Sequence, residues 1–381
     1  MILRMSTLKT TYSSEKQQYK VDVLIVIPEM SSGGAERVVS NLIEYWINRN
    51  LRVAIYSLLY SRDQSFYRLD PRVLWVNDDY VSINHPSSLI RSWTHLRRIR
   101  KLIVSLNPRS VLSFLPSANV LSILAATMCD TRVIVSERNC MKKRPIDFKW
   151  RVLRFLTYRF SHAVVVNLSS NIEVLARFVP RGKIIYLRNP LKRPAPAAKE
   201  DRKRIVLCIG RFTEQKRIDY LVEAFCASDI AKTGWELHLV GYGPLKSDIT
   251  ALAHRLDRYE SIKIFEPIAD VWDSYWDASI LALTSKYEGM PNVLLEAMAR
   301  GLIPIVTAGV GDLATQIFDC DERLVVPGGD VIVFSRMLRE VCEHKVPSGA
   351  LEQCIKSKIE PYFIENTIVD WDEVVWGTHR S

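Results

Sequence analysis

The chain has 381 residues, of which 48% are hydrophobic and 25% are charged, and these proportions are typical of a soluble globular protein with two domains. No run of about 18 uninterrupted apolar residues is present, and residues 1–20 lack the apolar core of a signal peptide, so the sequence predicts neither a transmembrane helix nor a leader. The net charge of +10 is unevenly divided, because residues 1–200 hold 32 Lys and Arg against 14 Asp and Glu, whereas residues 201–381 hold 20 against 28.

Short apolar runs alternate with amphipathic stretches along the first half of the chain. Residues 21–29 form a largely apolar run rich in β-branched residues, which predicts a strand buried on both faces of a parallel sheet. A helix is expected over residues 35–49. Further strands are expected at 52–58, 110–114, 131–136, 163–166 and 184–187, and further helices at about 91–106, 147–160 and 169–178. This alternation predicts a doubly wound α/β domain.

Residues 188–204 interrupt this alternation with three prolines and a cluster of charges, which indicates a linker. The alternation then resumes. Strands are expected at about 204–209, 236–241, 262–265, 279–284, 303–306 and 323–326. The sequence therefore predicts two doubly wound, Rossmann-like α/β domains, with ligands bound in the cleft beyond the carboxyl ends of the strands. We predict an N-terminal domain over 1–190, a linker over 191–204, a C-terminal domain over 205–360, and a segment over 361–381 that returns to the N-terminal domain.

The seven cysteines are scattered, odd in number and without a C-x-x-C pair, so we expect reduced thiols in a cytoplasmic protein rather than a disulfide framework or a zinc site. Asp319 and Asp321 have the spacing of a metal-binding motif, but they lie in a predicted loop. We expect no metal there.

Three stretches combine strand ends with residues suited to an anionic ligand. Gly33 and Gly34 follow the first strand and precede a helix, where a close backbone approach and helix amides favour phosphate, although a plain strand-to-helix turn is the alternative. Arg211 and Lys216 follow the strand that ends at Gly210. A planar fork and a point charge together suit a diphosphate, and the alternative is two solvated loop cations.

The third stretch holds two glutamates, Glu288 and Glu296, on either side of a helix start at about Pro291. Proline is favoured in the first helical turn, and the amides of that turn lack helical partners. Eight positions at about 100° each bring the second carboxylate back to within roughly 80° of the first direction. Both carboxylates can therefore face one ligand, although an ordinary helix start explains the spacing equally well.

In this order and on these elements, the three stretches resemble the retaining glycosyltransferases of family 4, which have the GT-B fold. The matching residues are "GGAERV" at 33–38, Gly210-Arg211-x4-Lys216 and Glu288-x7-Glu296. The resemblance spans about Val21 to about Val346.

The resemblance implies that Arg211 and Lys216 bind the diphosphate of a nucleotide sugar and stabilise it as it leaves, and that Glu288 contacts the donor sugar. Glu296 would accept the ribose hydroxyls. Members typically act without a metal and retain the anomeric configuration by front-face attack, so no cofactor is expected. The other implied donor-binding residues are Gly33, Gly34, Gly289, Met290, Pro291, Asn292 and Val293, with Pro267 and Ile268 against the base.

Two stretches depart from the family pattern. Many relatives carry a histidine after the strand at about 131–136, where this chain has the sequence "SERN". The variant resembles a subset of polysaccharide and lipid-linked oligosaccharide transferases, and Glu137 and Arg138 become candidates for the acceptor side. Residues 308–317 lack the glycine pair followed by glutamate that is common in the family.

Between Arg91 and Lys199 there are 22 Lys and Arg against 4 Asp and Glu. Residues 91–106 and 141–160 interleave these cations with large apolar side chains at helical spacing, which is typical of a helix in a membrane interface. A core-packed helix with a solvated basic face is the alternative. We expect an anionic membrane surface as a partner, with the protein peripheral on the inner face of the cytoplasmic membrane, and no nucleic-acid partner.

The sequence thus predicts an enzyme, a retaining glycosyltransferase that moves a sugar from a nucleoside-diphosphate sugar, UDP-sugar favoured, onto a glycan or lipid-linked acceptor. Two alternatives within this fold are a nucleotide-sugar epimerase and a phosphorylase. A further alternative is a non-catalytic glycan-binding subunit, but the presence of both glutamates and both cations argues against it.

Overall fold

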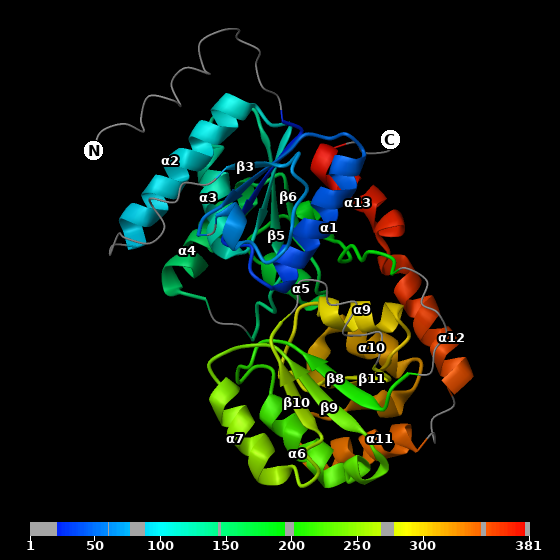
Figure 1. The fold of residues 1–381 in the computed structure, drawn as a ribbon. Coiled ribbons are helices and arrows are strands. Elements are labelled where there is room, and N and C mark those ends of the chain that lie inside the picture. Colours follow the sequence, from blue (N-terminus) through cyan, green and yellow to red (C-terminus); the bar gives the residue numbers. More distant parts are fainter. Residues whose placement is uncertain are drawn as a thin grey trace.

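A computed structural model describes residues 21–59, 61–76, 88–143, 146–194, 202–267, 278–343 and 348–377. Figure 1 shows two α/β domains, one above the other, with the C-terminal helices running along both.

The described part of the N-terminal domain contains a seven-stranded sheet in the order β3-β2-β1-β4-β5-β6-β7, and every pairing in it is parallel. Side chains alternate between its two faces. In β1, Val23, Ile25 and Ile27 pack on one face, whereas Leu24 and Val26 pack on the other. Both faces are covered, which is why these strands have continuous apolar sequences. The strands are β1 (Val23–Ile27), β2 (Val53–Ser57), β3 (Leu74–Val76), β4 (Ser110–Phe114), β5 (Arg132–Glu137), β6 (Ala163–Val166) and β7 (Ile184–Tyr186).

Helices cover both faces of this sheet. The α-helices are α1 (Gly34–Asn48), α2 (Ser88–Leu106), α3 (Pro116–Ala125), α4 (Phe148–Thr157) and α5 (Ser170–Leu175), and the 3-10 helices are η1 (Arg62–Gln64), η2 (Tyr158–Phe160) and η3 (Arg181–Lys183). The faces differ in what they pack against, because α1 shares one core with the last helix of the chain, whereas α2, α3 and α4 cover the other.

The described part of the C-terminal domain contains a six-stranded parallel sheet in the order β10-β9-β8-β11-β12-β13. Its strands are β8 (Ile205–Ile209), β9 (Glu236–Val240), β10 (Ile262–Phe265), β11 (Ile280–Leu283), β12 (Ile303–Thr307) and β13 (Val325–Val326). Its α-helices are α6 (Ile218–Ser228), α7 (Lys246–Leu256), α9 (Asn292–Ala299), α10 (Asp312–Phe318), α11 (Val331–Cys342) and α12 (Ser348–Ile359). Its 3-10 helices are η4 (Ile230–Thr233), η5 (Ala308–Val310), η6 (Glu322–Leu324) and η7 (Glu360–Tyr362).

The last helix, α13 (Ile364–Trp376), packs on the N-terminal sheet beside α1. Trp371 is fully buried, and Trp376 meets Trp46 edge to face with ring centroids 5.6 Å apart. The chain therefore passes between the domains twice. The predicted linker lies partly outside the described residues, and its exact limits stay a prediction.

The predicted fold class is confirmed, since both sheets are parallel and doubly wound. Several elements had no predicted range, among them β3, α3 and the helices α7, α10, α11, α12 and α13. The strand β3 has only three residues, and α3 is buried almost all around, so it lacks the polar face that marks an amphipathic helix.

The expectation that all cysteines are reduced is wrong, because a disulfide joins Cys320, just after α10, to Cys354 in α12. The two residues are 34 positions apart, so no short motif announces the pair. Their proximity comes from the packing of α12 against the C-terminal domain. The other five cysteines are free. In the described ranges, no helix combines the length and apolar character needed to cross a membrane.

Candidate active site

A cavity of about 260 Å³ lies between the two domains. Its lining comes from the segments that follow β1, β2, β4, β5, β6 and β7 in one sheet and β8, β9 and β11 in the other. The carboxyl ends of two parallel sheets thus face each other across one space, as expected for ligand sites in doubly wound folds.

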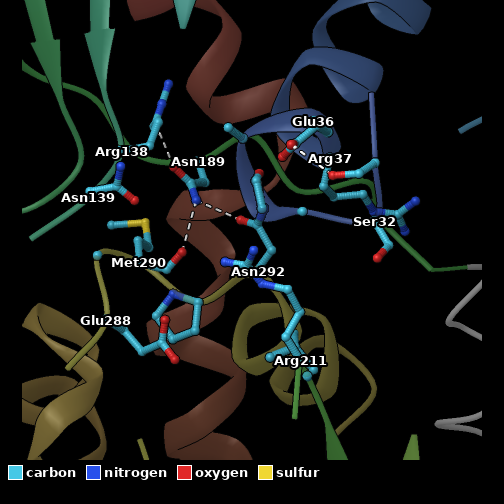
Figure 2. A pocket seen from close by; sticks show the side chains of 18 of the residues that line it. Ser32, Glu36, Arg37, Arg138, Asn139, Asn189, Arg211, Glu288, Met290 and Asn292 are labelled. Atoms are coloured by element: carbon cyan, nitrogen blue, oxygen red, sulfur yellow. Dashed lines mark hydrogen bonds between the residues drawn. The ribbon is translucent and has the colours of Figure 1, made fainter. Parts of the chain in front are cut away.

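Most of the predicted site residues meet at this cavity. Glu137 and Pro267 do not line it, and Ile268 falls outside the described residues. The predicted residues that line the cavity are Gly33, Gly34, Arg138, Arg211, Lys216, Glu288, Gly289, Met290, Pro291, Asn292, Val293 and Glu296. Figure 2 shows Glu288 and Arg211 on the C-terminal side of this pocket and Glu36 and Arg37 on the N-terminal side.

Glu288 follows β11 and is held by two donors on the same oxygen. The ammonium of Lys216 donates to Oε1 at 2.5 Å and the hydroxyl of Ser285 at 2.6 Å. The side chains of Lys216 and Glu288 are 17% and 11% exposed. These contacts fix the direction of the Glu288 carboxylate and keep Lys216 beside it at the edge of the cavity.

The loop that carries Arg211 and Lys216 is bonded to the loop that carries Glu288. The amide of Lys286 donates to the carbonyl of Gln215 at 2.8 Å, and the Gln215 side chain donates to the carbonyl of Tyr287 at 2.8 Å. The hydroxyl of Thr284 donates to the carbonyl of Lys216 at 2.9 Å. Two loops about seventy residues apart in the sequence are therefore hydrogen-bonded to each other on the C-terminal side of the cavity.

Glu296 lies in α9 and is 4% exposed. Arg37, in α1 of the opposite domain, donates from Nε to its carboxylate at 2.7 Å. The ion pair spans the cleft and gives a buried carboxylate the partner it needs.

The amino terminus of α1 faces the cavity at Gly33 and Gly34. Glu36, in the first turn, folds back over this end, so a Cβ on Gly33 would lie 2.2 Å from Oε2 of Glu36. The hydroxyl of Ser31 donates to Oε1 of Glu36 at 3.2 Å. Burial raises the pKa of Glu36 to about 7, and the nearby Glu29 adds to this rise.

The two domains approach each other closely at Gly289. A Cβ on Gly289 would lie 2.3 Å from the carbonyl oxygen of Arg138, closer than the close-packed interior of a protein allows for carbon and oxygen. Only glycine allows the loop after β11 to lie against the end of β5.

Glu137 is not at the cleft. Its carboxylate is fully buried, accepts a hydrogen bond of 2.5 Å from the hydroxyl of Tyr158, and lies 3.8 Å from Arg154 in α4. Burial raises the pKa of Tyr158, and the neighbouring carboxylate raises it further. The contacts place Glu137 in the core between β5 and α4.

Arg138 lines the cavity but is only 7% exposed. Its guanidinium lies 4.9 Å from the ring of Trp371 and 5.4 Å from the ring of Phe114. Nη1 donates to Oδ1 of Asn189 at 2.7 Å, while Nε and Nη2 have no partner among the described residues. Burial lowers the pKa of Arg138 to about 9.

Several cavity residues escaped the sequence prediction. Glu36 and Arg37 stand inside the matched "GGAERV" stretch, so the motif pointed to them without giving them a role. Four others stood in no motif. Asn167, Asn189 and Tyr242 lie just after β6, β7 and β9, and Tyr67 lies in the loop between β2 and β3.

The acidic pair considered as a metal site is engaged otherwise. Asp319 pairs with Lys358 at 2.8 Å and Asp321 with Arg323 at 2.6 Å. Within the described ranges, no three His, Cys, Asp or Glu side chains gather as metal ligands would.

Comparisons with known families follow the division into two domains. Residues 32–192 match the model described as "Glycosyltransferase Family 4". Residues 192–359 match the model described as "Glycosyl transferases group 1".

Two bacterial relatives extend over most of the chain. The amylovoran biosynthesis glycosyltransferase AmsD of Erwinia amylovora is 28% identical over 299 residues, which cover 72% of this chain and 77% of that protein. An α-1,4-N-acetyl-D-galactosaminyltransferase of Campylobacter jejuni, which acts on an undecaprenol-diphosphate-linked glycan by its name, is 24% identical over 368 residues, or 93% of this chain and 98% of that one.

The fold is shared with solved structures. The crystal structure of Anabaena HepE in complex with UDP and glucose superimposes with a TM-score of 0.73 at 13% identity, covering 93% of this chain and 99% of that one.

The two parallel-sheet domains have the GT-B fold. With both domains matched by glycosyltransferase models, this chain belongs to the glycosyltransferase superfamily and is a transferase.

Proposed function

We propose that this protein is a retaining glycosyltransferase that transfers a sugar from a UDP-sugar to a lipid-linked glycan. The observation that carries the proposal is the convergence on one cavity of Arg211 and Lys216, the Glu288 loop and the amino termini of α1 and α9. Two cations and two helix amino termini at one place form a site that attracts the negative charge of a nucleoside diphosphate.

In this proposal Arg211 and Lys216 neutralise the diphosphate as the bond to the sugar breaks. Fixed cations in a partly dry cleft stabilise developing negative charge without reorganisation. Lys216 is paired with Glu288 in the structure, at 2.5 Å, so it lies between the sugar-side carboxylate and the space for the phosphates. Glu288 faces the donor sugar, and Glu296 with Arg37 lies where the ribose binds.

The proposal of retention comes from the resemblance to the retaining family, and the structure adds the arrangement of Glu288. Lys216 and Ser285 both donate to its Oε1, which holds the carboxylate as an oriented acceptor for sugar hydroxyls. The proposed route is front-face attack, in which the acceptor hydroxyl loses its proton to the departing diphosphate on the same side of the sugar.

The proposed acceptor is attached to a lipid, and the proposed partner surface is an anionic membrane. The support is the surface of α2, α4 and η2, where Trp93, Phe148 and Phe160 are 53%, 69% and 70% exposed. Arginines stack on two of these rings, with Arg97 over Trp93 and Arg151 over Phe148. Exposed aromatic rings beside cations suit a lipid interface.

The variant Glu288→Ala tests the assignment of the site. We expect turnover to fall by at least about a hundredfold, as for other lost groups that act on the transition state. The matched control is Glu236→Gln, in which a carboxylate outside the cavity, paired with His238, is neutralised. Wild-type turnover in a folded Glu288→Ala enzyme contradicts the proposal.

The alternatives give different products. An epimerase would consume the nucleotide sugar with no acceptor and release no nucleoside diphosphate. A binding subunit would hold the nucleotide sugar without turnover, whatever acceptor is supplied.

A further inference from the structure

Asn189 lies just after β7, on the segment that leads out of the N-terminal domain, and is 2% exposed. Its side chain contacts both domains. On the N-terminal side, Oδ1 accepts hydrogen bonds from Nη1 of Arg138 at 2.7 Å and from Nδ2 of Asn167 at 3.4 Å. On the C-terminal side, Nδ2 donates to Oδ1 of Asn292 at 2.6 Å and to the carbonyl of Met290 at 3.3 Å. Figure 2 shows Asn189 between Arg138 and Asn292.

The path continues to the opposite wall of the cavity. Nδ2 of Asn292, the first residue of α9, donates to the carbonyl of Gly34 at 2.7 Å. Three hydrogen bonds thus run from Arg138 through Asn189 and Asn292 to Gly34. They join the end of β5, the interdomain segment, the amino terminus of α9 and the amino terminus of α1.

The direction of this path is determined at both ends. A guanidinium only donates, and a backbone carbonyl only accepts. Asn189 must therefore turn its oxygen to Arg138 and its nitrogen to Asn292, and Asn292 must turn its nitrogen to Gly34. No other orientation of the two amides satisfies every contact.

Arg138 gives the path a strong anchor. Its charge is buried, and no carboxylate pairs with it among the described residues. Hydrogen bonds from an ionised donor are stronger than neutral ones, so the contact to Asn189 is the one that orients the amide.

We propose that Asn189 is a positioning residue that couples closure of the cleft to the arrangement of the donor-binding turn at Met290–Asn292. The proposal rests on the proposed function, because that turn is the one assigned to the donor sugar and phosphate. Both ends of the Asn189 amide are engaged by protein partners at the edge of the cavity, so we assign it the positioning of the turn and not the binding of the substrate. It holds Met290 and Asn292 in place only while the two domains are close enough for Asn292 to reach Gly34.

An isosteric change separates this role from simple packing. Asn189→Asp keeps the size of the side chain but replaces its amide donor with a second acceptor. If Asn292 keeps its orientation, its oxygen then faces the new carboxylate, and if its amide turns over, its oxygen faces the carbonyl of Gly34 instead. The path therefore breaks at one of these two contacts in either case. Asn189→Ala removes the path altogether.

The test compares Asn189→Asp and Asn189→Ala with the matched control Asn171→Ala. Asn171 is also a fully buried asparagine, but it donates to the carbonyl of Asn139 and accepts from the amide of Met141, all within the N-terminal domain. The measurements are the KM for the nucleotide sugar with kcat, and the radius of gyration of the ligand-free protein by small-angle X-ray scattering.

We expect both Asn189 variants to raise the donor KM by about tenfold or more and to enlarge the radius of gyration, with the control unchanged in both. The proposal is overturned if Asn189→Asp matches the wild type, or if the control shows the same changes. If the wild-type protein releases nucleoside diphosphate from none of the donors, the proposed function is overturned. The comparison of the radii of gyration then still tests whether Asn189 holds the two domains together.

Discussion

At the scale of single residues, the buried carboxylate of Glu36 makes the protein sensitive to pH. It lies at the amino terminus of α1, beside Glu29 and across the cleft from Arg211, and burial raises its pKa to about 7. The native protein therefore binds a proton there that the unfolded chain has released once the pH exceeds its ordinary value of 4.5.

The unfolding free energy is expected to fall as the pH rises from about 4.5 to about 7, by roughly 3 kcal/mol for this group alone. Above about pH 7 the contribution of Glu36 to the unfolding free energy no longer changes with pH. Glu36→Gln removes the buried charge, so this variant is expected to lack that part of the pH dependence and to be more stable than the wild type at pH 8. Urea unfolding of both proteins at pH 5 and pH 8 measures the difference, and equal pH dependence in the two would contradict it.

At the residue scale, the sequence indicated which loops lie at the carboxyl ends of the strands. Arg211 and Lys216 lie between β8 and α6, Glu288 lies between β11 and α9, and both loops line the cavity. The roles of these three residues stay predictions. Glu137 lies away from the cavity because the direction of a side chain at a strand end depends on its neighbours. Arg154 and Tyr158 draw that carboxylate into the core.

At the scale of elements, α4 presents an apolar face to solvent. Phe148 and Phe155 are exposed, and the ring of Phe155 carries Arg159 at 5.6 Å. Burying one such ring in a lipid interface contributes about 1.5–3 kcal/mol.

We therefore expect the double variant Phe148→Ser, Phe155→Ser to bind anionic vesicles at least about tenfold more weakly than the wild type. Ile332→Ser in α11, which removes a similarly exposed apolar side chain from the other domain, is the matched control. Co-flotation with phosphatidylglycerol vesicles measures binding. Equal flotation of all three proteins would count against a membrane-facing α4.

The disulfide between Cys320 and Cys354 fastens α12 to the body of the C-terminal domain. A cross-link that closes a loop of this size stabilises a protein by roughly 4 kcal/mol at most in the chain-entropy picture. Thiol titration of the denatured protein without reductant is expected to find the five free thiols, and a reductant is expected to lower the melting temperature. A titration that also finds the thiols of Cys320 and Cys354 would show that the pair is not formed.

Helices and strands could be predicted from the sequence where the spacing of their apolar residues is typical of one of the two. The strands β1, β2, β4, β5 and β6 are apolar runs bounded by polar residues. The pairing of Cys320 with Cys354 has no local cause, because it depends on where α12 comes to lie after the chain leaves α11.

At the scale of the whole molecule, the contacts that close the cleft come from both domains. Arg37 reaches Glu296, Asn292 reaches Gly34, and Asp312 of α10 accepts two hydrogen bonds of 2.8 Å from Ser169 beside α5. None of these pairs is close in sequence. Their positions follow from the placement of one domain on the other, which no local pattern contains.

The most direct measurement is the release of nucleoside diphosphate from a panel of UDP- and GDP-sugars, with and without lipid-linked glycan acceptors. We expect release that requires an acceptor, is greatest with a UDP-sugar, and is lost in Glu288→Ala. Consumption of the donor without acceptor and without release of diphosphate, or no turnover with any pair of substrates, would contradict a glycosyl transfer at this cleft.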